Sequence, residues 1–155
     1  MSMKCLFLFG SLIFFATCAF ARIGETLDEC KFRYGSAGQI AADQFTFQTG
    51  HINIVVHIRN GRSVQEDFAP QSGTVLSEAD FAQLLQENSE GSSWELTGET
   101  ATYATYLRKD GKATAQKGRP NTNTTESGNI KLSMQGAELI IKYTAEAANA
   151  LAPAP

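Results

Sequence analysis

The side chains best suited to catalysis or metal binding are few and scattered in this sequence. Only two histidines, His51 and His57, occur in 155 residues. In an extended chain with a rise of about 3.3 Å per residue they lie about 20 Å apart, too far to share a metal ion. The sequence also lacks a Cys/His cluster, an acidic calcium loop, a Gly-x-Ser-x-Gly elbow and a phosphate-binding glycine loop. It therefore predicts no catalytic residues, no metal site and no cofactor.

Acidic pairs and one cysteine are the remaining reactive groups. Neighbouring carboxylates such as Glu66 and Asp67 point to opposite faces of a strand, so they cannot act on one substrate together. A nucleophile pair of Cys30 with His57 would require an exposed thiol, whereas Cys30 falls on the apolar stripe of an expected helix. An enzyme would need a dispersed acid–base site, for example one built on His57. We keep that as the less favoured alternative.

The outward face of one expected strand is a better functional candidate. In the segment from Ile52 to Ile58, every second residue is a branched apolar residue that would face a core. The intervening residues Asn53, His57 and Arg59 then face outward, and we predict that they form a surface for another protein. Nearby aromatic residues would strengthen such a surface, because aromatic and Arg side chains dominate binding energy; the candidates are Trp94, Tyr103 and Tyr106. The alternative is an ordinary solvated sheet face.

This strand belongs to an expected three-stranded meander. A two-residue turn at Gly50-His51 pairs Phe47 with Ile54 and Phe45 with Val56 on one apolar side. For the next hairpin we prefer a three-residue loop, 59–61. A one-residue slip inverts every side chain, and this register pairs Val64 with Val56 and Phe68 with Ile52. It leaves Glu66 on the apolar side.

Two helices are marked by their ends. Thr26 and Glu29 form a capping-box pair before the first helix, and Gly35 stops it. Ser77 and Asp80 mark the start of a second helix, whose apolar face carries Phe81, Leu84 and Leu85; these residues lie in the segment 76–88.

The second half of the chain continues with further strands. We expect them at 94–96, 100–108 and 113–116, then a long mobile loop over 117–129 that contains no aliphatic residue. A last hairpin around Gln135-Gly136 would pair Ile130 with Ile141, and residues 147–155 would form a disordered tail. The predicted fold class is α+β, with two short helices packed on an antiparallel sheet. The order of elements also allows two tandem helix-plus-meander units, 22–70 and 74–146, within one domain spanning 22–146.

The first 21 residues have the pattern of an export signal. Lys4 precedes an apolar run, and Ala19-Phe20-Ala21 offers a cleavage site before Arg22. The run of about 16 residues is short for a membrane span, so we expect no span after cleavage. The destination would be the periplasm or the extracellular space. A lipoprotein anchored through Cys18 is a minor alternative.

Composition limits the partners of the mature chain. Cleavage would remove two of three cysteines and leave Cys30 without an intramolecular partner, so a disulfide scaffold is excluded. The net charge of −3 for the whole chain would become −4, which argues against nucleic acid. A structural or assembly role in the envelope remains an alternative to binding, and no oligomeric state is predicted.

The opening of the mature chain resembles a known group. Ile23-Gly24-Glu25-Thr26, Cys30 and Arg33-Tyr34-Gly35 are similar to the start of small uncharacterised exported bacterial proteins. In architecture, a short helix before an antiparallel meander is distantly similar to outer-membrane assembly lipoproteins of the SmpA/OmlA type and to β-lactamase inhibitor proteins. The inhibitors are built from two such units in tandem, so this resemblance implies a binding or inhibitory protein without catalytic residues.

Overall fold

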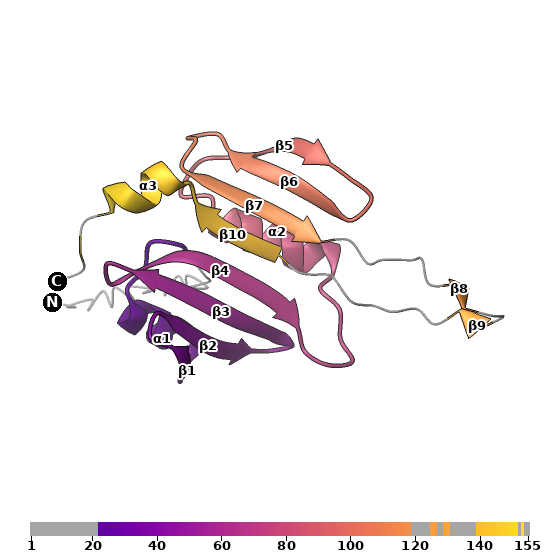
Figure 1. Cartoon of the computed structure of the whole chain (residues 1–155), viewed down its shortest axis with the longest axis horizontal. Helices are drawn as coiled ribbons and strands as arrows, with labels where there is room; N and C mark the ends of the chain where they lie inside the picture. Colours follow the sequence, from indigo (N-terminus) through magenta and orange to yellow (C-terminus); the bar gives the residue numbers. More distant parts are fainter. Residues whose placement is uncertain (1–21, 119–124, 127–128, 131–138, 152, 154–155) are drawn as a thin grey trace, which may run out of the picture.

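One antiparallel sheet organises the chain. The computed structural model describes residues 22–118, 125–126, 129–130, 139–151 and 153. Eight strands form this sheet in the order β1-β2-β3-β4-β10-β7-β6-β5 (Figure 1). In chain order they are β1 (Gly38–Ala41), β2 (Gln44–Thr49), β3 (Ile52–Arg59), β4 (Arg62–Pro70), β5 (Trp94–Glu99), β6 (Tyr103–Arg108), β7 (Ala113–Gly118) and β10 (Leu139–Tyr143). Two short strands, β8 (Thr125–Glu126) and β9 (Asn129–Ile130), pair only with each other.

The helices confirm the expected α+β class. Helix α1 (Leu27–Tyr34) and helix α2 (Glu78–Glu87) lie behind the sheet in the view of Figure 1. Thr26 and Ser77 cap them, and each makes a full capping box with the acidic residue three positions later, as their sequences predict. A third helix, α3 (Ala145–Ala150), follows β10, and its Ala148 is buried. Residues 147–150 therefore belong to a helix and not to the expected disordered tail.

The last strand joins the two halves of the chain. β10 lies between β4 and β7, so Ile141 is opposite Glu66 on one side and Ala115 on the other. The expected pairing of Ile130 with Ile141 is wrong, because Ile130 pairs with Thr125 in β9 and β8. The turn at Gln135-Gly136 and most of the 117–129 loop lie outside the described residues. Since β10 pairs with the last strand of the first half, the sheet continues across the boundary proposed between 70 and 74.

The hairpin of β2 and β3 has the predicted register, but the hairpin of β3 and β4 does not. Its turn has two residues, Asn60 and Gly61, both with positive φ of 53° and 76°, as a type I′ turn requires. A β-bulge at Val64 then shifts the register. Phe68 consequently faces Ile54, and Val64 does not pair with Val56.

This bulge places polar groups on the helix side of the sheet. Ser63 is fully buried, and the N-terminal segment covers it: Gly24 N–H donates to the Ser63 carbonyl at 2.7 Å, and Ser63 N–H donates to the Glu25 carbonyl at 2.7 Å. The pattern of apolar residues in β3 and β4 could not reveal this cover, because Gly24 and Glu25 lie 39 and 38 positions earlier in the chain. The expected three-residue loop is therefore wrong: the structure has a two-residue turn followed by a bulge, with Ser63 buried.

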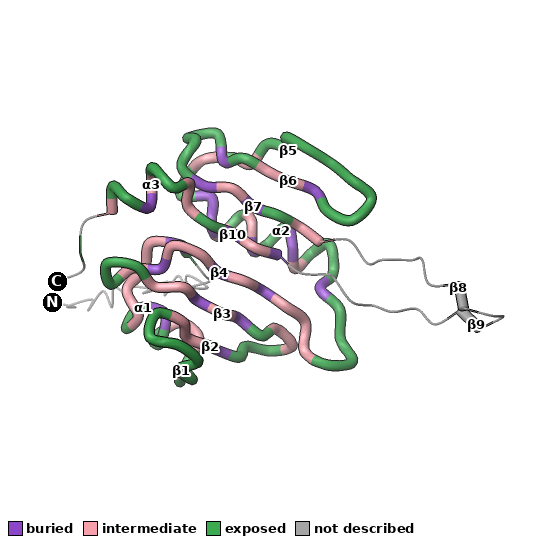
Figure 2. Tube along the Cα trace, viewed as in Figure 1, coloured by how far each residue is buried: buried purple, intermediate pink, exposed green. Residues whose placement is uncertain are grey.

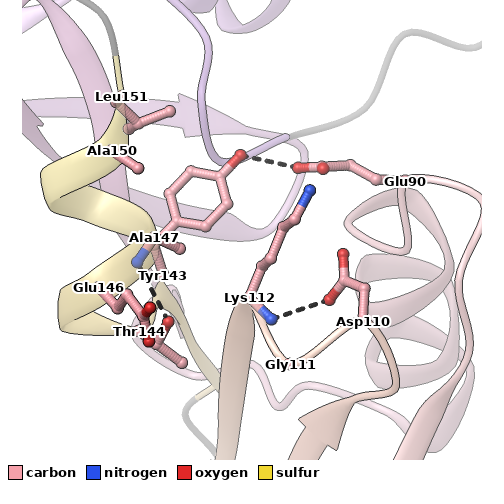
Figure 3. A pocket seen from close by; sticks show the side chains of 10 residues that line it. All are labelled: Glu90, Asp110, Gly111, Lys112, Tyr143, Thr144, Glu146, Ala147, Ala150 and Leu151. Atoms are coloured by element: carbon pink, nitrogen blue, oxygen red, sulfur yellow. Dashed lines mark hydrogen bonds between the residues drawn. The ribbon is translucent and has the colours of Figure 1, made fainter.

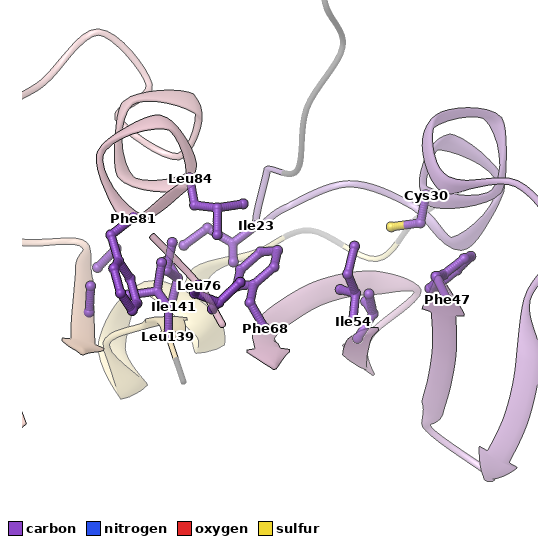
Figure 4. Packing of buried hydrophobic residues seen from close by; sticks show 13 residues of the cluster. Ile23, Cys30, Phe47, Ile54, Phe68, Leu76, Phe81, Leu84, Leu139 and Ile141 are labelled. Atoms are coloured by element: carbon purple, nitrogen blue, oxygen red, sulfur yellow. The ribbon is translucent and has the colours of Figure 1, made fainter. Parts of the chain in front are cut away.

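The core lies between this side of the sheet and the two helices. Phe81 and Leu84 of α2 cover one half and Cys30 of α1 the other, with Ile23 between them (Figure 4). Buried residues alternate with less buried ones in inner strands such as β3, β7 and β10, whereas the edge strands β1 and β5 have none (Figure 2). The other side of the sheet carries no helix among the described residues (Figure 1). The chain thus has a helix side, which holds the core, and an open face.

The strand register places the carboxyl group of Glu66 on the helix side of the sheet, opposite Val56. Glu66 is 0% exposed, its Oε2 accepts a 3.4 Å hydrogen bond from the Tyr34 hydroxyl, and its Oε1 has no partner among the described residues. Burial, with repulsion from Glu25, raises its pKa to about 8. The carboxyl group is therefore protonated at neutral pH.

Replacement of Glu66 by Gln should remove a pH-dependent loss of stability. The unfolded carboxyl titrates near 4.5 and the folded one near 8, so the folded state binds more protons between these values. The contribution of the Glu66 carboxyl to the free energy of unfolding is fully present below the unfolded pKa and is lost as pH rises toward 8. We expect Glu66→Gln to raise Tm by about 5 °C at pH 8.5 and by much less at pH 5, measured by circular dichroism. The control is Glu95→Gln at an exposed site; an equal Tm change for Glu66→Gln at both pH values would contradict the assignment.

Candidate functional site

The open face of the sheet presents one side chain from every second strand residue. The strand pairing places five side chains on this face: Asn53 and His57 of β3, Gln65 and Asp67 of β4, and Ile140 of β10. Further along the sheet, Gln116, Thr105 and Leu107 continue the same face on β7 and β6. These side chains are a mixture of amides, charges and apolar groups, which suits a binding surface and does not form a core.

The three predicted binding residues lie on this face along β3. Asn53 and Arg59 are exposed, and His57 is partly buried between them. His57 Nε2 is 3.0 Å from Asp67 Oδ2, and Gln65 Nε2 donates to Asp67 Oδ1 at 2.7 Å. The carboxylate therefore holds the imidazole in place, and the amide holds the carboxylate. β3 is third from one edge of the sheet, and β4 and β10 occupy the middle.

Only one of the three aromatic candidates lies on the open face. Tyr103 is 38% exposed there, four strands from β3, which corresponds to about 19 Å. Trp94 lies on the helix side, where its indole N–H donates to the Leu85 carbonyl at 2.7 Å. Tyr106 packs against the core as well. Leu107, 37% exposed, lies on the same face of β6, with Thr105 between it and Tyr103. Both apolar side chains are separate from the His57–Asp67 pair.

A polar network at one end of the fold was not foreseen from the sequence. Arg108 is 0% exposed, yet its guanidinium contacts Asp110, Glu90 and the Asn88 carbonyl at 3.0–3.2 Å. The neighbouring Asp110 in the turn after β6 was the one available signal. Glu90 and Asn88 come from the segment after α2, and no local pattern connects them with β6.

This network forms one wall of a cavity of about 570 Å³. Figure 3 shows Tyr143 between α3 and the turn after β6, with the ammonium of Lys112 pointing toward Glu90. The Tyr143 hydroxyl lies 2.8 Å from Glu90 Oε1 and 3.1 Å from the Ile23 carbonyl. Burial and the nearby Glu90 carboxylate raise the pKa of Tyr143, so the hydroxyl stays protonated. The Tyr143 hydroxyl thereby connects β10 with Glu90 and with the N-terminal segment at Ile23.

Cys30 is isolated from the open face. It is a free thiol, 0% exposed, on the core side of α1. Burial, followed by repulsion from Glu66, raises its pKa to about 12. His57 lies on the opposite side of the sheet, so the two cannot act as a nucleophile pair.

The part of the chain that the structure describes contains neither a metal-ligand cluster nor a membrane-spanning helix. No group of three His, Cys, Asp or Glu side chains comes together within this part of the chain as metal ligands would. None of the helices described is both long and apolar enough to span a membrane.

Comparisons with known proteins add no relationship. No family model, curated protein or solved structure matches this chain. The resemblances to exported bacterial proteins, SmpA/OmlA lipoproteins and β-lactamase inhibitors therefore stay predictions from the sequence.

Replacement of Arg108 should destabilise the whole domain. Arg108→Met would remove the buried cation and leave the buried Asn88 carbonyl without its donor, whereas Glu90 and Asp110 are partly exposed and can regain water. Loss of a buried hydrogen bond from a charged donor lowers the free energy of unfolding by about 2 kcal/mol. We expect a correspondingly lower midpoint in urea denaturation. The matched control is Lys109→Met, an exposed cation at the next position, which should change the midpoint little. A midpoint for Arg108→Met equal to that of the control would refute this role.

The Cys30 thiol should be unreactive in the folded protein. Its raised pKa and lack of exposure both keep it from forming an accessible thiolate. We expect less than about a tenth of Cys30 to react with iodoacetamide at pH 8 without denaturant, and full reaction in concentrated urea. Peptide mapping by mass spectrometry identifies the labelled position. Rapid native labelling would show that α1 opens readily.

Proposed function

We propose that this protein is an exported, non-catalytic binding module that holds a partner protein on the open face of its sheet. The observation that carries the proposal is the His57–Asp67–Gln65 network, fixed at 2.7–3.0 Å on a sheet side that no described helix covers. A fixed, partly buried imidazole next to exposed Asn53 and Arg59 offers an ordered set of hydrogen-bonding groups. Preordered side chains lose less entropy on binding.

Contacts near the N-terminus support the export part of the proposal. Ile23, two residues after the expected cleavage site, is 2% exposed, and its N–H donates to Asn88 Oδ1 at 2.9 Å. Arg22 is exposed. Cleavage after Ala21 would therefore keep every core residue in the mature protein. Export would place the open face in the periplasm or outside the cell.

The His57–Asp67 contact also gives the enzyme alternative its one specific observation. A histidine held by a carboxylate is the arrangement of many general bases. However, neither His57 nor Asp67 is among the residues that line the cavities of about 570 and 270 Å³. A solvent-facing sheet surface suits recognition of a large partner better than enclosure of a small substrate.

Site-specific photo-crosslinking tests the proposed face. A photoreactive amino acid at Asn53 or Lys142, both exposed on the open face, should give one protein adduct in the producing cells. The same amino acid at Gln86 or Phe32, exposed on the helices, is the control and should not. We expect His57→Ala with Arg59→Ala to reduce the adduct from Asn53 at least about tenfold, while Tm changes little.

The outcome of this experiment separates the alternatives. Adducts from the helix positions alone would refute the open face as the binding surface. Turnover of a small molecule that is lost with His57→Ala would favour the enzyme. Measurement of the intact mass of the purified protein tests processing, since a mass that begins at Arg22 is expected.

A further inference from the structure

A second cavity, of about 270 Å³, lies on the helix side of the sheet. It is distinct from the open face and from the cavity beside α3. Side chains of the sheet form its floor, and Tyr34 of α1 and Leu84 of α2 form its walls. The floor consists of Ile52, Ile54 and Phe68. Figure 4 shows Ile54 and Phe68 on the sheet below the space that separates the two helices.

The size and lining of this cleft define what can enter it. A dry cavity of about 150 Å³ admits benzene, so 270 Å³ has room for a one- or two-ring molecule. Aromatic rings pack well against other aromatic rings in edge-to-face or offset geometry. The rings of Tyr34 and Phe68 both line the cleft. An aromatic body therefore fits better than a flexible chain, which would also lose more conformational entropy on binding.

A polar pair, His51 and Asp80, lies at the mouth of the cleft. His51 Nε2 lies 3.3 Å from Asp80 Oδ2, and the His51 side chain is 43% exposed. Asp80 is fixed in turn, because its Oδ2 accepts 2.7 Å hydrogen bonds from the N–H and hydroxyl of Ser77. The negative charge of Asp80 disfavours a carboxylate or phosphate at this position. A neutral hydroxyl group can both donate to and accept from such a pair.

The inner wall of the cleft is held in place by a buried contact. Tyr34, which lines the cleft, donates its hydroxyl to Glu66 at 3.4 Å. Glu66 lies two residues before Phe68 on the same side of β4 and is 0% exposed. The Tyr34 ring is therefore fixed against the sheet and can act as a preordered wall for a ligand.

We propose that this cleft binds a small neutral aromatic alcohol, with its ring over Ile54 and Phe68 and its hydroxyl group at the His51–Asp80 pair. The site is on the opposite side of the sheet from His57, so it would operate in addition to the proposed protein-binding face. Its ligand would bind between α1 and α2 and would favour the arrangement in which both helices are packed on the sheet.

Binding of 2-naphthol, with naphthalene as a probe that lacks the hydroxyl, tests this proposal by NMR titration of the purified protein. We expect saturable binding of 2-naphthol and a rise in Tm at saturation. Intermolecular NOEs should connect the ring to Ile54 and Phe68. His51→Ala should weaken 2-naphthol binding about fivefold and leave naphthalene binding unchanged, because it removes one hydrogen-bonding group.

Matched variants locate the site independently of His51. Gln83→Trp places an indole at the cleft mouth and should abolish binding of both probes, whereas Ala82→Trp, at the neighbouring exposed position on α2, should not. His57→Ala should leave both affinities unchanged, which separates this site from the protein-binding face. Absence of saturable binding, NOEs to Tyr143 and Ala147 of the other cavity, or equal binding by Gln83→Trp would overturn the proposal.

Discussion

Arg108 has no contact with solvent, and its guanidinium makes five N–O contacts of 3.0–3.2 Å with Asn88, Glu90 and Asp110. A guanidinium out of water is tolerated only when such partners replace its hydration. The partners come from the end of α2 and from the turn after β6. The network continues through Glu90 to Tyr143, and through the Tyr143 hydroxyl and Asn88 to Ile23. Displacement of the segment after α2 or of the turn after β6 would remove direct partners of the cation.

The sheet has two unlike sides, and the insertion of β10 depends on one of them. β10 can insert between β4 and β7 only if its helix-side residues, Leu139 and Ile141, fit under α2, and both are 0% exposed there. Ala113 and Ala115 on the adjacent strand are also buried; their small side chains leave room for Phe81. The core is therefore complete on one side. The strand residues that alternate with these buried residues point away from the core and form the open face.

The sequence was informative where a structure depends on neighbouring residues. Both capping boxes and the β2–β3 register follow from spacings of a few residues, and both were predicted. The β3–β4 bulge, the Arg108 network and the insertion of β10 depend on partners tens of positions away. For the candidate site, alternation in β3 correctly put Asn53 and His57 on one face. It could not show that Asp67 would fix His57, because that contact depends on the bulge.

That bulge links the fold to both proposed sites. It places Gln65 opposite His57 and Asp67 opposite Val55, which puts the Asp67 carboxylate within reach of the imidazole on the open face. The same register places Glu66 and Phe68 on the helix side, where Phe68 forms part of the cleft floor. Without the extra residue, every side chain of β4 beyond the bulge would change sides. Asp67 would then be buried, and Glu66 would be exposed. One inserted residue, Val64, thus determines which carboxylate is available to a partner and which remains protonated in the core.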